Sequence, residues 1–574
     1  MANEEIARLL REIAVYLEMD DVPFKPRAYE KASEGVLGTD EDVRTIYARG
    51  GLKALEQIPA VGTSIAEKIE EFLRTGKIAH HDELKKKVPV ELSEFAGIEG
   101  IGPKTLKVLY QKLKIRNLAD LEKAARQGKI KKLPGFGPKS EENILQGIAF
   151  VRRSSGRFVL GQVMPEIELI TEELRKLSGV ESVTVAGSVR RRKDTVGDAD
   201  LLVIAKKPKA VMGHFVSMPD VVQVHAHGET KSSVKLKNGM DADLRIVPKE
   251  SYGAALNYFT GSKDHNVALR ELAIKNGWKL NEYGLFAGTK RIAGKTEEEV
   301  YKKLGLRYIE PELREMTGEL EAARKNELPD LIPYGSLRGD LQVQTDWTDG
   351  DASIEAMAEA AIKAGLEYIV ITDHTKRLAM AHGLDAKRIK QQWAEIDRVN
   401  AALKKKGKKF TVLKGTECDI LKDGTMDLPD EILAQCDVVG GSVHSLFNLP
   451  EKQQTERIMR AMSNPHVDIL FHPTGRVLNK REAYAVDMAA LIRQAKKTGT
   501  VMEIDAYPER ADLKAEHIRM CVEAGVKMSI DSDAHSPAHF QFLEYGVAQA
   551  RRGWAGKKDI INAWPLEKML KMLK

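Results

Sequence analysis

The 574-residue sequence contains few cysteines and lacks any long apolar segment. Its three cysteines, Cys418, Cys436 and Cys521, are too few and too scattered for a disulfide framework or a zinc ribbon, which favours a reducing cytoplasm. No apolar run approaches the roughly 18–20 residues that a membrane-spanning helix needs, and the acidic, amphipathic N-terminus is unlike a signal peptide. We therefore expect a cytoplasmic protein without a membrane partner.

The excess of positive charge is small but unevenly distributed. The formal net charge is only +6. The basic stretches LKKKVP, GKIKKLPG and SVRRRKD all fall within the first two hundred residues, whereas the last third mixes both signs. A basic front end indicates a polyanionic partner, although a charged run is also the ordinary composition of a solvated helix face.

The chain is too long for one hydrophobic core, so several domains are expected. Residues 1–150 show the apolar spacing of three and four that is typical of helices, as in IARLLREIAVYLEM and SIAEKIEEFLRTG. Short β-rich runs interrupted by helices follow to about residue 318. After residue 336 strands and helices alternate, which predicts parallel strands in an α/β barrel. Residues 319–335 contain two prolines and little periodicity, which indicates a linker.

One pattern occurs three times in the helical region, as LEQIPAVGTSIAEKI (55–69), FAGIEGIGPKTLKVL (95–109) and IKKLPGFGPKSEENI (130–144). Each copy has an apolar anchor, a glycine-containing hairpin and a polar or basic helix start. Glycine lets backbone N–H groups approach a partner closely at a helix N-terminus, which suits a nucleic-acid phosphate and reads no base. Such binding is expected to be salt-sensitive and independent of base sequence. Ordinary packing of helices across a turn is the alternative.

The repeated pattern resembles the helix-hairpin-helix motif of DNA-binding proteins. The resemblance implies that the hairpin glycines contact the DNA backbone, namely Gly62, Gly100, Gly102, Gly135 and Gly137. The first copy departs from the pattern, because Ala60 stands where the other copies have their first glycine.

Two pairs of aspartates lie at the starts of two apolar strands in the middle of the chain. Asp198 and Asp200 are two residues apart in GDADLLVIA, and Asp241 and Asp243 are two apart in DADLRIVP. Since side chains alternate between the two faces of a strand, each pair shares a face. Neighbouring carboxylates repel unless a cation lies between them, and hard oxygen ligands favour Mg²⁺ or Mn²⁺. Three such carboxylates can hold two ions about 3.5–4 Å apart for phosphoryl transfer.

These strands belong to a series of motifs that resembles the catalytic core of family X DNA polymerases. The series runs GS-x-RR, GDAD, DLRIVP, YFTGS and NEYGLF, and with the hairpin repeats the resemblance covers about residues 5–318. It implies that Asp198, Asp200 and Asp243 bind the metal ions, with Asp241 only a neighbour. Taken singly, a Gly-Ser turn or a D-x-D strand is more often a plain turn or a solvated edge. A nucleotidyltransferase of another kind could share those two motifs, but YFTGS and NEY argue against it.

The same resemblance implies a nucleotide-binding site. Its residues are Gly187, Ser188, Arg191, Tyr258, Phe259, Gly261, Asn266 and Arg270. Ser188 and Arg191 match positions that hold the incoming triphosphate. Tyr258 and Phe259 match the segment that closes on the sugar and discourages a ribose 2′-hydroxyl. Asn266 and Arg270 match residues that contact the new base pair and the template in the minor groove.

Lys68 is a second catalytic candidate. It matches the lysine of the family that forms a Schiff base with an abasic sugar, and Lys25 and Tyr29 match the residues that accompany it. Such an amine needs a lowered pKa from burial or from nearby cations, whereas Glu67 and Glu70 would act the other way. A solvated helix lysine is the alternative.

Histidines and carboxylates follow the expected strands of the last third, in ITDH, KGTECD, GSVHS, FHPTGR and DSDAH. Catalytic residues at successive strand ends are typical of the upper face of a barrel. With DLQVQTDWTDG (340–350) this pattern resembles the polymerase-and-histidinol-phosphatase (PHP) domain that is fused to bacterial and archaeal family X polymerases. In that family the domain is a metal-dependent 3′-to-5′ exonuclease, sometimes with abasic-site endonuclease activity, built around three ions of Zn²⁺ or Mn²⁺.

The resemblance implies two metal sites whose ligands are present. Glu417, His444 and His472 match one of them. Asp349, His374 and His535 match another, and Asp373 precedes His374 at the same strand end.

The third metal site departs from the family pattern. It would need two imidazoles together with Glu417 and Asp533, but Gln342 and Gln344 stand in their place. A neutral amide oxygen is a far poorer ligand for Zn²⁺ or Mn²⁺ than an imidazole nitrogen. We therefore expect this site to be empty or weak, and exonuclease activity to be low or absent.

A second departure lies nearby in MEIDAYPERADL. Asp505 and Tyr507 stand where the family usually has asparagines, whereas Arg510 and Asp512 remain. The glutamines and these two residues together set this chain apart from the family pattern.

The resemblance implies the following parts: a helix-hairpin-helix, lyase-like domain at 1–80, a helix-hairpin-helix DNA-binding subdomain at 81–153, a nucleotidyltransferase palm at 154–250, a nascent-base-pair-binding subdomain at 251–318, a linker at 319–335 and a PHP domain at 336–574. The expected folds are all-α, then α+β for the palm and its C-terminal subdomain, then a distorted (β/α)7-type α/β barrel. The implied function is template-directed filling of short gaps during repair, by a prokaryotic monomer that binds gapped or primer-template DNA and dNTPs. A DNA-end or gap-binding scaffold, and a repair nuclease with secondary polymerase activity, are the alternatives.

Overall fold

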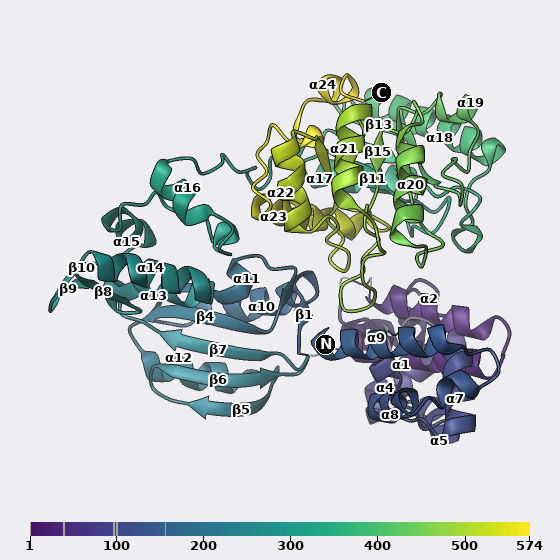
Figure 1. The fold of residues 1–574 in the computed structure, drawn as a ribbon. Helices are drawn as coiled ribbons and strands as arrows, with labels where there is room; N and C mark the ends of the chain where they lie inside the picture. Colours follow the sequence, from purple (N-terminus) through teal and green to yellow (C-terminus); the bar gives the residue numbers. More distant parts are fainter. Residues whose placement is uncertain are drawn as a thin grey trace. The chain divides into compact units, whose positions relative to one another are not determined.

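The computed structural model describes residues 2–37, 39, 41–95, 98, 101–154 and 156–573. The chain divides into two compact units (Figure 1). The first comprises residues 1–155 and 479–481, and the second comprises residues 156–478 and 482–574. Gly100, one of the expected DNA-binding glycines, lies outside the described residues.

The first unit is helical throughout its described elements, which confirms the expected all-α fold. Its helices are α1 (Ala2–Met19), α2 (Lys25–Leu37), α3 (Val43–Leu55), α4 (Thr63–Thr75), α5 (Ala79–Lys87), α6 (Leu92–Phe95), α7 (Pro103–Leu113), α8 (Leu118–Arg126) and α9 (Pro138–Ser154), with a short 3₁₀ turn η1 (Ile130–Lys132). Ile6, Leu10, Ile13 and Leu17 form the buried stripe of α1. Their spacing of four, three and four residues places them on one helix face, which packs against α2, α5 and α7.

The palm is a five-stranded sheet in the order β2-β4-β7-β6-β5 (Figure 1). The strands are β2 (Val180–Val185), β4 (Asp198–Ala205), β5 (Val221–His227), β6 (Lys231–Leu236) and β7 (Asp241–Ile246), and a short pair joins β1 (Phe158–Val159) to β3 (Thr195–Val196). The helices α10 (Leu160–Arg175) and α12 (Pro208–Val216) pack on one face of this sheet. Ala199, Leu201 and Val203 of β4 point into that core. Alternation along the strand therefore leaves Asp198 and Asp200 on the opposite, open face.

A smaller subdomain follows the palm. It consists of α13 (Tyr252–Thr260), α14 (Lys263–Lys275), a three-stranded antiparallel sheet of β8 (Trp278–Asn281), β9 (Gly284–Ala287) and β10 (Lys290–Ala293), and α15 (Glu297–Lys303), with the turns η2 (Lys249–Ser251) and η3 (Pro311–Leu313). Helix α13 contacts α11 (Gly187–Arg190), a short helix of the palm that follows β2. Arg314 is fully buried here and forms an ion pair of 2.6 Å with Glu297, which also accepts two hydrogen bonds from Arg190. Glu297 thus joins the subdomain to Arg190, which lies in the turn after β2.

The segment 319–335, expected to be a linker, is partly helical. Helix α16 (Glu319–Lys325) buries Ala322 and Ala323 in the core of the preceding subdomain, and Ile332 is buried in the core of the following domain. A helix of seven residues is too short for a helical period to show in the sequence, which explains why the expectation missed it.

The last domain is a barrel of parallel strands in sequential order from β11 to β17. The strands are β11 (Gly339–Val343), β12 (Tyr368–Ile371), β13 (Thr411–Asp419), β14 (Val438–Ser442), β15 (Ile469–Leu470), β16 (Val501–Asp505) and β17 (Met528–Asp531). The intervening helices are α17 (Ile354–Lys363), α18 (Ala386–Lys405), α19 (Asp430–Leu433), α20 (Glu451–Met462), α21 (Met488–Thr498), α22 (Ala515–Ala524), α23 (Leu543–Arg552) and α24 (Leu566–Leu570), with the turns η4 (Ala379–Ala381), η5 (Pro537–Phe542) and η6 (Ile561–Ala563).

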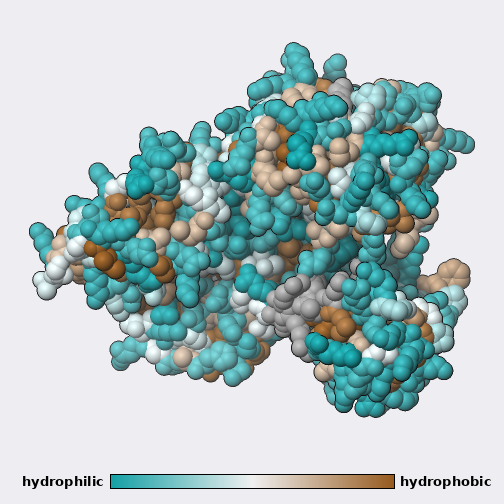
Figure 2. All heavy atoms as spheres, viewed as in Figure 1, coloured by the Kyte–Doolittle hydropathy of each residue, from teal (hydrophilic) through white to brown (hydrophobic). Residues whose placement is uncertain are grey.

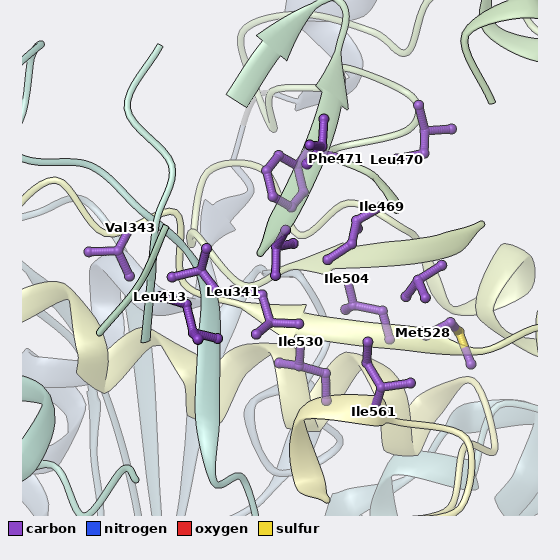
Figure 3. Packing of buried hydrophobic residues seen from close by; sticks show 14 of the residues in the cluster. Leu341, Val343, Leu413, Ile469, Leu470, Phe471, Ile504, Met528, Ile530 and Ile561 are labelled. Carbon is purple, nitrogen blue, oxygen red and sulfur yellow. The ribbon is translucent and has the colours of Figure 1, made fainter. Parts of the chain in front are cut away.

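The barrel is nearly closed, because Val343 at the end of β11 bridges in parallel to Ala534 just after β17. Figure 3 shows side chains of its core, among them Leu341, Ile504 and Ile530, packed between strands that are far apart in sequence. This arrangement confirms the expected α/β barrel of seven parallel strands.

Among the described residues, no helix is long and apolar enough to cross a membrane. On the face drawn in Figure 2 hydrophilic side chains predominate and the hydrophobic patches are small.

Candidate functional site

The four aspartates of the palm meet at adjacent strands. Strands β4 and β7 pair in parallel, with Asp198 opposite Asp241 and Asp200 opposite Asp243. The expected shared face therefore exists, and all four carboxylates start their strands at the same edge of the sheet.

Mutual repulsion shows in the ionisation of this cluster. Burial, followed by the charges of Asp198 and Asp243, raises the pKa of Asp200 to about 7. Burial and then Asp243 also raise the pKa of Asp198. The pKa of Asp241 is instead lowered, chiefly by a hydrogen bond from Lys235, whose Nζ lies 2.7 Å from its Oδ1. Oxygen ligands that resist ionisation together fit a site for a hard divalent cation, whereas Asp241 already has its own counter-charge.

Two residues of β6 that the sequence analysis did not single out contact Asp243. Ser233 donates a hydrogen bond of 2.5 Å to Asp243 Oδ1, and Lys231 Nζ lies 3.3 Å from Oδ2. Strand β6 pairs with β7 so that Ser233 faces Asp243 directly. The orientation of this carboxylate is thus set from the neighbouring strand.

A cleft of about 660 Å³ opens over the carboxylates. All the expected nucleotide-binding residues line it, together with Asp198, Asp200 and Asp241; Arg157 and Lys263 also line it and were not foreseen. Gly187 adopts φ +61°, and a Cβ there would lie 2.4 Å from Asp200 Oδ2. Only glycine lets this turn lie so close to the carboxylate.

The opposite wall of the cleft is organised around Arg191. Its Nε donates to Glu315 Oε1 at 2.8 Å, and its Nη1 donates to the carbonyl of Thr260. The rings of Tyr258 and Phe259 meet edge to face with centroids 5.1 Å apart, and Asn266 donates to the Tyr258 carbonyl at 2.6 Å. These contacts join Arg191, expected to hold the triphosphate, to the segment expected to meet the sugar.

The hairpin glycines of the first unit precede helices. Gly62 and Gly102 are the extended N-cap residues of α4 and α7, without a side-chain cap, and Gly137 directly precedes α9. A Cβ at any of these, or at Gly135, would meet nothing within 4 Å, so their backbone faces open space. Ala60 adopts φ +59°, in the same left-handed region as Gly135 at φ +85°, so the first copy keeps the hairpin shape despite its different residue.

Lys68 lies on α4 with its Nζ 6.0 Å from the centroid of the Tyr29 ring. Its Nζ donates to the carbonyl and hydroxyl of Ser64 at 3.0 and 3.1 Å. Burial, then the charge of Lys68, lowers the pKa of His80; Glu83 opposes this effect and Lys25 adds to it. Glu70 is directed elsewhere, since its Oε1 accepts from Tyr47.

The expected ligands of the barrel converge at the carboxyl ends of its strands. Glu417 of β13 is the shared member: its Oε1 lies 3.0 Å from His444 Nε2 and 2.8 Å from His472 Nε2. Its Oε2 lies 3.3 Å from His374 Nδ1. Although they lie near Glu417, the buried atoms His374 Nδ1 and His444 Nε2 form no hydrogen bond of good geometry among the described residues, as is typical of atoms that bind an ion.

Two groups in the described part of the chain have the spacing of a metal site: Asp349 with His374 and His535, and His374 with Glu417 and His444. The first is the group expected from the sequence. The second differs from the group expected from the sequence, because it contains His374 where His472 was expected. His472 contacts the same Glu417 carboxylate, with its Nε2 2.8 Å from Oε1. Donor sets of imidazoles and carboxylates fit Zn²⁺ or Mn²⁺.

The charged groups of this cluster shift one another's pKa values. Burial alone would raise the pKa of Glu417, but His374 and His444 hold it well below its ordinary value. Burial would lower the pKa of His444, but Glu417 and Asp419 raise it to about 9. Asp419 accepts from His444 Nδ1 at 2.7 Å and so orients the imidazole, a role that the sequence analysis did not assign.

Asp373 does not join the cluster. Its carboxylate accepts from the backbone N–H and hydroxyl of Thr345 at 2.9 and 2.6 Å and from Gln392. It holds the loop after β11 in place.

The residues at the third site do not fit a metal ion. Gln342 is fully buried, and neither of its amide atoms has a partner among the described residues. Gln344 Nε2 donates to Glu417 Oε2 at 2.8 Å, while its Oε1 has no partner among the described residues and is a neutral oxygen, a poorer ligand for Zn²⁺ or Mn²⁺ than an imidazole nitrogen. Asp533 Oδ2 lies 3.4 Å from Arg510 Nε, which also lies 3.2 Å from Asp505 Oδ2.

Comparisons with known proteins cover all these parts. The sequence matches the families described as "Helix-hairpin-helix domain" over residues 1–78, "SAM-like Helix-hairpin-helix tandem" over 92–149, "DNA polymerase beta thumb" over 255–315 and "PHP domain" over 340–530. A protein from Thermoanaerobacter sp. (strain X514), named as a probable phosphatase, is 29% identical over 195 residues, 32% of this chain and 73% of that protein.

Two polymerases are also similar. DNA polymerase lambda of Rattus norvegicus is 29% identical over 289 residues, 45% of this chain and 48% of that protein. "DNA polymerase/3'-5' exonuclease PolX" of Bacillus subtilis (strain 168) is 38% identical over 579 residues, which is 100% of both chains. The chain therefore belongs to the PolX family, the family X DNA polymerases that carry helix-hairpin-helix repeats at the front and a PHP domain at the end.

Proposed function

We propose that this protein is a template-directed DNA polymerase that fills short gaps during DNA repair. The parallel register that places Asp198, Asp200 and Asp243 at one edge of the palm sheet is the observation that carries the proposal. When divalent cations are bound there, they supply activation of the primer 3′-hydroxyl and stabilisation of the leaving phosphate. The family membership supports DNA polymerase activity, and gap filling is the finer part of the proposal.

The residues of the chain prepare this step. The Gly187 turn and Arg191 line the cleft where a triphosphate would lie against the carboxylates. Ser233 and Lys231 hold Asp243 in orientation before substrate arrives. Tyr258 and Phe259 form the wall expected beside the sugar. In the first unit, Gly62, Gly102, Gly135 and Gly137, where an added Cβ would meet nothing within 4 Å, would let the DNA backbone approach closely, without reading bases.

Primer extension on substrates that differ only in gap length tests this function. We expect the fastest extension on gaps of one to a few nucleotides that carry a 5′-phosphate on the downstream strand, and slower extension on an open template. Equal rates on gapped and open templates would contradict the gap-filling part. No extension on any substrate with Mg²⁺ or Mn²⁺ would favour a scaffold that only binds DNA ends.

We also propose that Lys68 acts as a lyase nucleophile on an abasic 5′-sugar phosphate. Its position beside Tyr29, with Nζ 6.0 Å from the ring centroid, supports this role. Borohydride should trap a covalent complex of abasic DNA with the unmodified chain and with Lys77→Ala, a control lysine beyond the same helix. Trapping that persists in Lys68→Ala would contradict the assignment.

The PHP domain is proposed to be a weak nuclease. Gln342 and Gln344 leave one of three expected ion positions without imidazole ligands, and a missing ion removes part of the activation of a nucleophile. With labelled DNA and no dNTPs, we expect 3′ resection by the unmodified chain to be at least about tenfold slower than extension with dNTPs. Rapid resection that Glu417→Ala abolishes would contradict this proposal and would favour a repair nuclease with secondary polymerase activity.

A further inference from the structure

The PHP domain contains a cation of its own beside the metal ligands. Arg510 follows β16, and its Nε lies 3.2 Å from Asp505 Oδ2 and 3.4 Å from Asp533 Oδ2. Asp505 is fully buried and Asp533 nearly so. The guanidinium is therefore held between two carboxylates, one from each of two neighbouring strand ends.

The surroundings of Arg510 are those of the ion cluster itself. Burial alone would lower the pKa of Arg510, but Asp533, Asp505 and Glu417 raise it above its ordinary value. Burial and then the charge of Arg510 lower the pKa of His472. Geometry relates Arg510 to the third ion position, because Asp533, one of the ligands expected there, has its Oδ2 3.4 Å from Arg510 Nε.

The amides beside it are poor ligands for a metal ion. Gln344 Nε2 donates to Glu417, and the amide oxygens of Gln342 and Gln344, although buried without a partner in the described part of the chain, are neutral and bind Zn²⁺ or Mn²⁺ far more weakly than imidazole nitrogens. A guanidinium needs no such ligands, because its charge does not depend on pH in the accessible range and its Nε already lies within ion-pair distance of both carboxylates.

We propose that the guanidinium of Arg510, clamped by Asp505 and Asp533, is the permanent third cation of the PHP cluster and excludes a metal ion from that position. The proposal deepens the weak-nuclease part of the proposed function and rests on it. The arginine supplies positive charge for a phosphate of the DNA end, but it binds no water that could be activated for hydrolysis. The remaining two groups, around Asp349 and His444, keep their capacity for an ion.

Counting bound metal tests this proposal without relying on activity. The full-length chain is loaded with Zn²⁺ or Mn²⁺, desalted and analysed by inductively coupled plasma mass spectrometry, in an Asp243→Ala background so that the palm adds little. Four further sets of changes are compared: Gln342→His with Gln344→His; the same pair with Asp505→Asn; the same pair with Arg510→Gln; and the same pair with Asp512→Asn. The last is a matched control, because Asp512 is buried on the same loop but its Oδ2 accepts from the Thr474 N–H.

We expect about two ions per chain for the unmodified cluster, for the two-histidine variant and for the Asp512→Asn control. Loosening the arginine with Asp505→Asn, or removing it with Arg510→Gln, should raise the two-histidine variant to about three ions. Three ions in the two-histidine variant alone, or in the unmodified cluster, would overturn the proposal, as would two ions in every variant. Circular dichroism identifies any variant that fails to fold. If either the Asp505→Asn or the Arg510→Gln variant fails to fold, the metal count of the other one tests the proposal. Primer extension by chains that keep Asp243 should be unchanged throughout, so a failure here is distinct from a failure of the polymerase proposal.

Discussion

The elevated pKa of Asp200 predicts that use of Mg²⁺ by the palm depends on pH. Burial and the charges of Asp198 and Asp243 raise this pKa to about 7. Below that pH a proton occupies the carboxylate and competes with the cation, so apparent affinity rises with pH and levels off above the pKa. For one group with this pKa, the Mg²⁺ concentration that gives half-maximal extension should be about tenfold higher at pH 6 than at pH 8.

Single-nucleotide gap filling, measured at a series of Mg²⁺ concentrations between pH 6 and pH 8, checks this magnitude. Asp241→Asn is the matched control, because Asp241 starts the neighbouring strand but has a lowered pKa and is paired with Lys235. The control should keep the pH dependence of the unmodified chain. A half-maximal concentration that is constant over this range, or that falls as pH falls, would refute the reasoning.

Three further changes test the packing around the site. Gly187→Ala should reduce extension by about a hundredfold, since its Cβ would lie 2.4 Å from Asp200 Oδ2, and a reduction below about fivefold in the same assay would count against the tight turn. Ser233→Ala should lower kcat/KM by roughly a factor of five to thirty, which corresponds to a loss of about 1–2 kcal/mol of transition-state stabilisation, because Asp243 loses a hydrogen bond. Ser233→Thr keeps the hydroxyl and should restore kcat/KM. An equal loss in both variants would mean that the hydroxyl is not the cause. Arg314→Met should lower the free energy of unfolding by about 3–5 kcal/mol in urea titrations, because Glu297 loses a buried partner, and a change under about 1 kcal/mol would show that the network is dispensable.

The sequence was sufficient where a local period or a repeated pattern determines position. Alternation along a strand predicted that Asp198 and Asp200 share a face, and β4 shows them on the face opposite its core residues. The hairpin repeats predicted helices that begin directly after Gly62 and Gly102, and α4 and α7 begin there.

The contacts that the sequence could not reveal depend on the register between strands and on loops. The hydrogen bond from Ser233 to Asp243 exists because β6 pairs with β7 in one register, and a shift of one residue would turn Ser233 to the other face. Asp419 meets His444 only because consecutive barrel strands end side by side. Asp373 shares a strand end with His374, but its carboxylate is used by the loop at Thr345, so proximity in sequence did not imply a shared role.

The central claim is that the three carboxylates of the palm perform nucleotide transfer, and a comparison of two aspartates on one strand tests it most directly. Gap filling with Mg²⁺ is measured for the unmodified chain, for Asp243→Ala and for Asp241→Ala, which differ by two positions on the same face of β7. We expect extension by the unmodified chain, loss of at least about a thousandfold in Asp243→Ala, and a loss of no more than about tenfold in Asp241→Ala. Equal extension by the two variants would contradict the claim.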